Sequence, residues 1–243
     1  MDANAYILNL KRASERQPQV KRTLARCPIS GISVPAIDAA QLTDDELQRV
    51  YRKYLHSPSY LLPLRRTEIA CFLSHRSIWK LIVESGLDAG LVLEDDVELI
   101  QPDFNEAFAF AMNNLRQGYY IKFQVKEFKN PPAPIISDGV HSLVQLAPAP
   151  LGATSQLVTR EAALRLLEMS TTFDRPVDTF VQMTWMTQVP VKAVTPKCVE
   201  EVSLQLGGST ISNRKTFTEV VRNELHRPYY RARVAMRSRR HRN

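Results

Sequence analysis

Short apolar runs of strand length alternate with longer helical patterns along most of the 243 residues. Apolar and β-branched runs predict strands at 5–10, 31–37, 91–93, 119–125, 143–146, 155–159 and 189–194. Strands that alternate with helices predict an α/β fold with a mostly parallel central sheet covered by helices on both faces. Ligands of such open sheets bind beyond the carboxyl ends of the strands, so functional residues are expected there.

The helical segments have recognisable starts and stops. They are predicted from residue 14 to before Pro28, at 43–55, 67–86 and 160–169, and from residues 103 and 174 onward. Thr43 and Glu46 have the spacing of a capping box, in which each side chain satisfies a free backbone donor of the other residue. Thr67 is predicted to cap the third helix, and Gly86 is predicted to end it.

The net charge of +7 is concentrated at the carboxyl end of the chain. Residues 227–243 hold seven arginines and no acid, so the remaining 25 basic residues balance all 25 acidic ones. We therefore predict a single domain over residues 1–226, followed by a basic tail over residues 227–243. Apolar residues between the arginines suit a helix lying on an anionic membrane surface, and a disordered solvated tail fits the same composition.

Other features bear on location and partners. The three cysteines form no CxxC pair, no basic start followed by an apolar run is seen at the N-terminus, and no apolar run approaches ~20 residues. These features lead us to expect a cytoplasmic protein that is peripheral on the inner face of the cytoplasmic membrane. The neutral body argues against nucleic acid as a partner. The absence of GxGxxG and GxxxxGK[ST] removes the glycine-loop dinucleotide and P-loop classes.

An acidic triplet, Glu94-Asp95-Asp96, directly follows the predicted strand at 91–93. Side chains alternate across a strand, so Glu94 and Asp96 are expected on one face and Asp95 on the other. Paired carboxylates offer the hard oxygen ligands that Mg²⁺ and Mn²⁺ favour. The triplet is thus a candidate metal site, and a solvated acidic turn is the alternative.

The helix predicted from Thr67 carries a polar stripe on an otherwise apolar segment. Glu68, Cys71 and His75 are spaced i, i+3 and i+7, so they share one face, with Ser74 beside them. This face could border a ligand pocket. The alternative is a core histidine paired with Glu68, with Cys71 as a small buried residue.

Five segments in this order resemble glycosyltransferase family 25, which includes bacterial lipooligosaccharide galactosyltransferases. They are residues 6–16 (YILNLKRASER), 67–75 (TEIACFLSH), 91–97 (LVLEDDV), 152–167 (GATSQLVTREAALRLL) and 176–178 (PVD). The resemblance implies a GT-A-like nucleotide-sugar-binding fold and an inverting hexosyltransferase that depends on Mn²⁺ or Mg²⁺. The implied donor is a UDP-sugar, with UDP-galactose favoured, and the implied acceptor is a lipooligosaccharide or a related glycan or glycolipid. Glycines that are usual in the family are missing near Thr67 and Ala153, which leaves the choice of donor open.

The resemblance also implies roles for particular residues. Contact with the metal and the diphosphate falls to Glu94, Asp95 and Asp96. Asp178 is the candidate base that removes the proton of the acceptor hydroxyl, although an acid in the first turn of a helix is an equal alternative. Donor binding is expected of a further set of residues, Asn9, Arg12, Arg16, Glu68, Ser74 and His75.

Two other functions remain open from the sequence. The acidic triplet would also serve a metal-dependent phosphohydrolase. The basic tail would also serve a non-catalytic protein that binds an anionic surface or nucleic acid.

Overall fold

An eight-stranded sheet organises the part of the chain that the computed structural model describes, which is residues 1–60, 62–206 and 217–241. Its strand order is β2-β1-β3-β8-β5-β9-β7-β6. The strands are β1 (Ala3–Asn9), β2 (Gly31–Pro35), β3 (Ala89–Glu94), β5 (Tyr120–Phe123), β6 (Ile136–Ser137), β7 (Ser142–Val144), β8 (Ser155–Thr159) and β9 (Val191–Thr195). Two further strands, β4 (Val97–Leu99) and β10 (Val199–Glu201), pair with each other in antiparallel fashion.

Strand direction confirms the prediction of a mostly parallel sheet. Within the described residues, six of the eight strands point the same way, and β7 and β8 point the opposite way. Strand β8 lies between β3 and β5 and is antiparallel to both. The apolar run at 155–159 predicted a strand here but carried no information about its direction.

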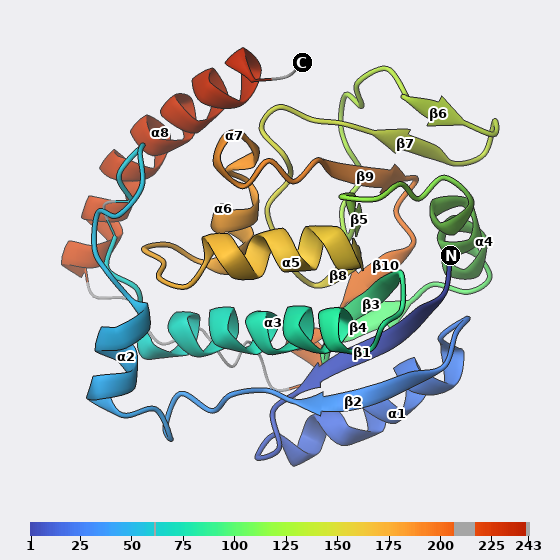
Figure 1. Ribbon diagram of the computed structural model, residues 1–243, viewed down its shortest axis with the longest axis horizontal. Coiled ribbons are helices and arrows are strands. Elements are labelled where there is room, and N and C mark those ends of the chain that lie inside the picture. Colours follow the sequence, from blue (N-terminus) through green and yellow to red (C-terminus); the bar gives the residue numbers. More distant parts are fainter. Residues whose placement is uncertain (61, 207–216, 242–243) are drawn as a thin grey trace.

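Helices cover both faces of the sheet, as predicted (Figure 1). Along β1, Tyr6 and Leu8 point into the core beneath α3 and α5, whereas Ala5 and Ile7 point into the core beneath α1 and α4. This period of two shows that the strand is buried on both faces.

The helices are α1 (Gln17–Arg26), preceded by a 3₁₀ turn at Ser14–Arg16, α2 (Asp44–Val50), α3 (Arg66–Glu84), α4 (Asp103–Asn113), α5 (Arg160–Met169), α6 (Val177–Val181), α7 (Thr184–Thr187) and α8 (Phe217–Arg240).

Two predicted helix ends differ from the structure. Helix α3 begins one residue before Thr67, and its N-cap is Arg65, whose backbone N–H donates to the Glu68 carboxylate at 2.8 Å. Helix α2 ends at Val50, before the predicted residue 55, because the Val50 carbonyl accepts from the Phe173 backbone N–H at 2.9 Å. The Thr43 capping box is confirmed, and Gly86 follows α3 with a φ of +75°.

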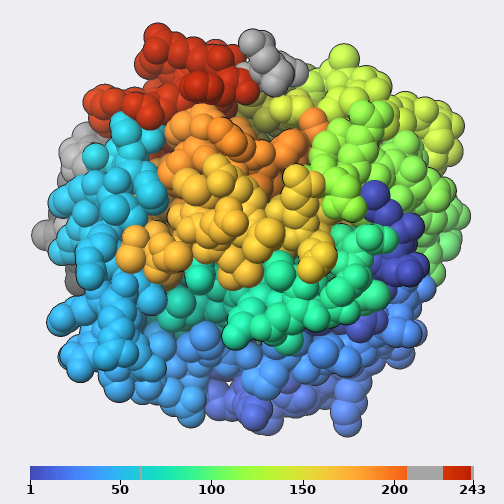
Figure 2. All heavy atoms as spheres, in the orientation of Figure 1, coloured from blue at the N-terminus to red at the C-terminus, as the bar shows by residue number. Residues whose placement is uncertain are grey.

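The described part of the basic tail lies in helix α8, which packs against the body. The Arg175 guanidinium donates to the Tyr230 hydroxyl at 2.8 Å, and Val234 is buried. Arg237 donates to the Ser57 carbonyl and hydroxyl at 3.0 and 2.8 Å. Figure 2 shows the helix as a red ridge at the edge of the molecule, beside the segment that contains Ser57. Helix α8 runs across residue 227, so the division between domain and tail stays a prediction. No helix among the described residues is long and apolar enough to cross a membrane.

The core beneath α3 depends on an aromatic cluster, which gives a stability prediction. The Phe72 ring stacks on Phe173 at a centroid distance of 3.8 Å and meets the Phe180 ring edge-on at 5.2 Å. Replacing Phe72 with alanine should lower the free energy of unfolding by about 3–5 kcal/mol, because a cavity remains. Urea denaturation measures this loss. The half-exposed Leu164→Ala is the control, expected within about 0.5 kcal/mol of wild type. Equal losses in the two variants would contradict the assignment of Phe72 to the core.

Candidate functional site

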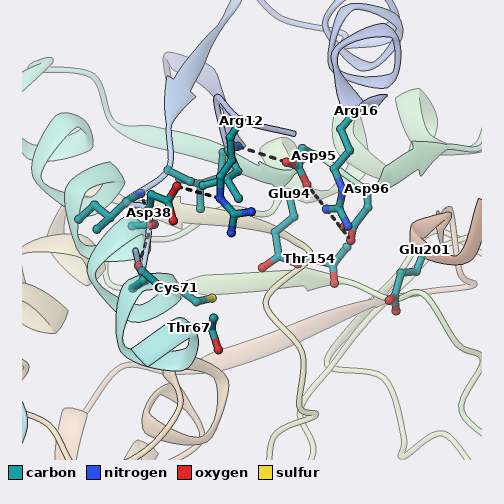
Figure 3. Close-up of a pocket in the computed structure, with 17 residues that line it drawn as sticks. Arg12, Arg16, Asp38, Thr67, Cys71, Glu94, Asp95, Asp96, Thr154 and Glu201 are labelled. Atoms are coloured by element: carbon teal, nitrogen blue, oxygen red, sulfur yellow. Dashed lines mark hydrogen bonds and ion pairs between the residues drawn. The ribbon is translucent and has the colours of Figure 1, made fainter. Parts of the chain in front are cut away.

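A cavity of about 210 Å³ lies at the carboxyl ends of β1, β2 and β3, where the sheet meets the first turns of α3 (Figure 3). The sequence pattern predicted functional residues at these carboxyl ends of the strands. Residues from these three strand ends line it together with Thr154 before β8 and Glu201 at the end of β10. Six of the predicted site residues line the cavity, namely Arg12, Arg16, Ser74, Glu94, Asp95 and Asp96.

Strand β3 ends at Glu94, and Arg16 contacts both Asp95 and Asp96, so the predicted alternation of the three acidic side chains is not borne out. Asp95 is buried, and the Arg16 guanidinium binds its Oδ1 while the Leu10 backbone N–H donates to its Oδ2 at 3.3 Å. Arg16 also donates to Asp96 at 3.2 Å. Figure 3 shows Asp95 directed toward β1 and Arg16, and Glu94 directed into the cavity. Asp95 is therefore held by the protein itself, and its role as a metal ligand stays a prediction.

The electrostatics of the triplet suit a divalent cation. Burial, followed by the nearby charge of Glu94, raises the pKa of Asp96 to about 7, although Arg16 opposes the shift. Asp96 is thus a buried carboxyl beside a second carboxylate, an environment in which a bound cation would favour the charged form. Carboxylate oxygens are the donors that Mg²⁺ and Mn²⁺ prefer, so Glu94 and Asp96 fit the predicted metal.

Arg12 and Asp38 form the opposite end of the cavity. Arg12 Nε lies 2.8 Å from Asp38 Oδ2, and the Arg12 side chain is 60% exposed. Ser74 supports the same loop, because its hydroxyl accepts from the Ile37 backbone N–H at 2.8 Å. The sequence reasoning missed Asp38. Its position just beyond the carboxyl end of a predicted strand was the signal that could have found it.

His75 lies behind the cavity and contacts the triplet. Its side chain is fully buried, and its Nε2 lies 3.3 Å from Glu94 Oε1. The predicted alternative of a core histidine paired with Glu68 is wrong about the partner, because the Glu68 carboxylate caps α3 instead. Cys71, one turn before His75, lines the cavity, and burial raises the pKa of its thiol well above its usual value.

Asp178 lies in the first turn of α6 and is tied to a loop beside the cavity. Its Oδ2 accepts from the Gly152 backbone N–H at 3.0 Å, and its Oδ1 accepts from the Thr179 backbone N–H at 2.7 Å. Gly152 has a φ of +89°, a conformation that strains any residue with a Cβ. Both carboxylate oxygens thus have donors, and the assignment of Asp178 as the base stays a prediction.

Lys122 is a buried cation that the sequence reasoning missed. Its Nζ donates to the carbonyls of Pro150 and Gly152 at 2.5 and 2.6 Å, so it holds the loop that binds Asp178. Burial lowers its pKa to about 8. A single lysine within an apolar strand carries no sequence signal of such a role, because its partners are backbone carbonyls 28 and 30 residues away.

Asn9 completes the set of predicted residues. It is buried at the end of β1, where its Oδ1 accepts from Gln17 Nε2 at 3.1 Å. Asn9, Glu68, His75 and Asp178 lie outside the lining of the cavity, and their predicted roles in binding or catalysis stay predictions.

Comparison with known proteins gives partial matches to named relatives. Procollagen galactosyltransferase 2 of Homo sapiens is 35% identical over 115 residues, which are 46% of this chain and 18% of that protein. A glycosyltransferase 25 family member of Drosophila melanogaster is 28% identical over 146 residues, 56% of this chain and 24% of that protein. The chain thus spans less than a quarter of the length of these relatives.

Among solved structures, the chain is similar to a glycosyltransferase involved in the glycosylation of the major capsid of PBCV-1. The identity is 12% and the TM-score 0.41, over 79% of this chain and 82% of that one. The family described as "Glycosyltransferase family 25 (LPS biosynthesis protein)" matches residues 2–181, which include the cavity's strand ends and the acidic triplet. The chain therefore belongs to glycosyltransferase family 25.

Proposed function

We propose that this glycosyltransferase uses a divalent metal to transfer galactose from UDP-galactose to a glycan or glycolipid acceptor of the lipooligosaccharide or lipopolysaccharide type. The transfer inverts the anomeric centre and gives a β-linkage. The observation that carries the proposal is one cavity with Glu94 and Asp96 at one end and the Arg12–Asp38 pair at the other. The names of the procollagen galactosyltransferases support galactose as the sugar, and the family description supports the acceptor class.

Glu94 and Asp96 would hold Mn²⁺ or Mg²⁺. When bound, the ion offsets the negative charge that grows on the diphosphate leaving group. Asp95 anchors Arg16, and Arg16 in turn holds the Asp96 side chain at 3.2 Å. The pKa of Asp96 is raised mainly by burial and next by the charge of Glu94, and this supports a cation here because a bound cation would favour the charged carboxylate.

The nucleoside end of the donor would lie toward Arg12 and Asp38. Asp38 Oδ2 is fixed by Arg12 at 2.8 Å, and a carboxylate held in this way is an acceptor for N–H and O–H groups. The apolar walls of Leu8, Ala36 and Ile37 suit the flat face of a base. The donor would then extend along the cavity from Asp38 to the acidic triplet.

Asp178 is proposed as the base, in a loop arrangement that fixes its carboxylate. Gly152 donates to Oδ2 from a loop that Lys122 anchors, and Thr154 of the same loop lines the cavity. An acceptor hydroxyl arriving beside this loop would give up its proton to Asp178 as it attacks the sugar.

Helix α8 is proposed to hold the enzyme at an anionic membrane surface on the cytoplasmic side. Tyr230 and Val234 pack against the body, whereas Arg231, Arg239 and Arg240 are exposed. Tyr229 and Met236 are also 57% and 51% exposed. Exposed arginines interspersed with aromatic and apolar side chains are typical of an interfacial helix.

The metal assignment predicts that transfer is lost when Asp96 loses its charge. Asp96→Asn should abolish transfer from UDP-galactose in the presence of Mn²⁺, because a neutral amide oxygen binds a divalent cation far less well than a charged carboxylate. The assay measures galactosyl transfer to truncated lipooligosaccharide and, in a second arm, to a collagen peptide. Glu200→Gln, an exposed change outside the cavity, is the control and should retain activity. Full activity in excess EDTA would contradict metal dependence, and UDP release that never needs an acceptor would favour a phosphohydrolase.

Asp178→Asn should lower turnover much more than it weakens donor binding. Loss of a general base typically costs about 10²–10⁴-fold in rate, whereas the contacts to the donor remain. Turnover at saturating donor is compared with the affinity for UDP-galactose measured by calorimetry. Thr179→Ala is the matched control, because it keeps the Asp178 carboxylate and removes the neighbouring hydroxyl that donates to it at 3.1 Å, together with one methyl group. Normal turnover with collapsed donor affinity would make Asp178 a binding residue.

The membrane proposal predicts that surface charge on α8 controls binding to vesicles. A triple change of Arg231, Arg239 and Arg240 to glutamine should reduce sedimentation with anionic liposomes. Each basic residue near an anionic surface contributes about 1 kcal/mol to the binding free energy. Transfer to a small soluble acceptor should be unchanged, since these side chains are exposed and do not line the cavity. Added salt should release the wild-type protein.

The matched control for this experiment removes the same charge elsewhere. Lys80, Lys126 and Lys129 are exposed residues of the body, and their change to glutamine should leave liposome binding near that of wild type. Equal loss in both triple variants would mean that net charge, and not helix α8, binds the surface.

A further inference from the structure

Three side chains of different chemistry converge beside the cavity. Cys71 and His75 lie one turn apart on α3, and Glu94 ends β3. Their sulfur, nitrogen and oxygen ligand atoms all lie within 4.8 Å of one another. Figure 3 shows the Cys71 sulfur extending from α3 toward the Glu94 carboxylate. Neither the family match nor the proposed transfer reaction gives this cluster a role.

We propose that Cys71, His75 and Glu94 form a binding site for a zinc-type cation. A tetrahedral zinc ion, with bonds of about 2.0–2.2 Å to nitrogen and oxygen, separates these two ligand atoms by about 3.4 Å. His75 Nε2 and Glu94 Oε1 are 3.3 Å apart, which matches that separation and is longer than a usual hydrogen bond. The ligands therefore need little rearrangement to accept the ion.

The three metal ligands favour a different metal from the one proposed at the acidic triplet. Thiolate and imidazole are softer ligands than carboxylate, and a mixed sulfur, nitrogen and oxygen set is typical of zinc. Cys71 and Glu94 line the cavity, whereas His75 is fully buried behind them. A cation held by these three residues would keep its fourth position open toward the cavity.

The zinc ion at this site would be exchangeable. Histidines of tightly bound zinc sites donate their second ring nitrogen to a carboxylate or carbonyl. His75 Nδ1 has no hydrogen-bond partner among the described residues, so the ring lacks this support. The affinity should accordingly lie below that of structural zinc sites.

Occupancy of this site would oppose transfer. Glu94 is shared with the proposed Mn²⁺ site, so an ion bound by Cys71 and His75 takes one carboxylate away from the triplet. Zinc should then inhibit Mn²⁺-dependent transfer, a consequence that rests on the proposed function. Binding of the zinc-type cation itself does not rest on it.

Cobalt titration of the reduced, metal-free, full-length protein tests the site directly. Tetrahedral Co²⁺ with a thiolate ligand gives an intense charge-transfer band in the near ultraviolet, and Co²⁺ bound only by carboxylates does not. We expect this band in the wild type and expect one equivalent of Zn²⁺ to remove it. Cys71→Ser should abolish the band. Cys27→Ser and Cys198→Ser, which change the other two free cysteines, should retain it.

Glu94→Gln supplies a second measurement that does not depend on how Cys71→Ser folds. It should keep the thiolate band but weaken Co²⁺ binding by about tenfold or more, because it removes the charge of a direct ligand and loss of even an outer-shell partner costs about 10–100-fold. A wild-type protein without the band, a band that persists in folded Cys71→Ser, or unchanged affinity in Glu94→Gln would each overturn the site. Weak cobalt absorption with no thiolate band would overturn the zinc site and leave the proposed transfer intact. A thiolate band in a protein without transfer activity would support the zinc site and contradict the proposed transfer.

Discussion

The buried ion pair between Arg16 and Asp95 is the interaction on which the rest of the site depends. Arg16 precedes α1, after the turn that follows β1, and Asp95 follows β3, so their contact joins the ends of two neighbouring parallel strands. Burying two charges is costly unless each is paired and further hydrogen-bonded. Here Asp95 also accepts from the Leu10 backbone, and Arg16 reaches Asp96. This network fixes the turn in which the acidic triplet lies.

The cavity follows from that fixed turn and from the way α3 crosses the sheet. With Asp95 held toward Arg16, Glu94 projects into the space beneath α3 and meets His75. Ser74 ties the same helix to the loop that presents Asp38. Lys122 and Gly152 hold Asp178 at a third point. Each of these polar groups is positioned by another part of the chain, so the site has the second layer of contacts that precise chemistry requires.

The sequence predicted what depends on local pattern, and it missed what depends on long-range contact. Apolar runs at β1, β3 and β8, alternating with helical patterns, predicted the α/β class and the strand ends where the cavity lies. The direction of β8 depends on pairing with β3, whose partner residues are 62 to 70 positions away. The pairing of β4 with β10, which brings Glu201 to the cavity, joins residues about a hundred positions apart. The partner of His75 was missed for the same reason, since Glu94 lies 19 residues away on another element. The start of α3 at Arg66 was missed because the predicted N-cap was Thr67, whereas the Glu68 carboxylate accepts from the backbone N–H of Arg65, a residue type that rarely caps helices.

The most direct test of the account is a crystal structure of the full chain with Mn²⁺ and UDP, in which an anomalous difference map locates the manganese. The account predicts one manganese peak within coordination distance of the Glu94 and Asp96 carboxylates. It also predicts that the diphosphate contacts that ion and that the nucleoside lies toward Arg12 and Asp38. UDP bound with no manganese at the triplet, or bound outside the cavity, would contradict it.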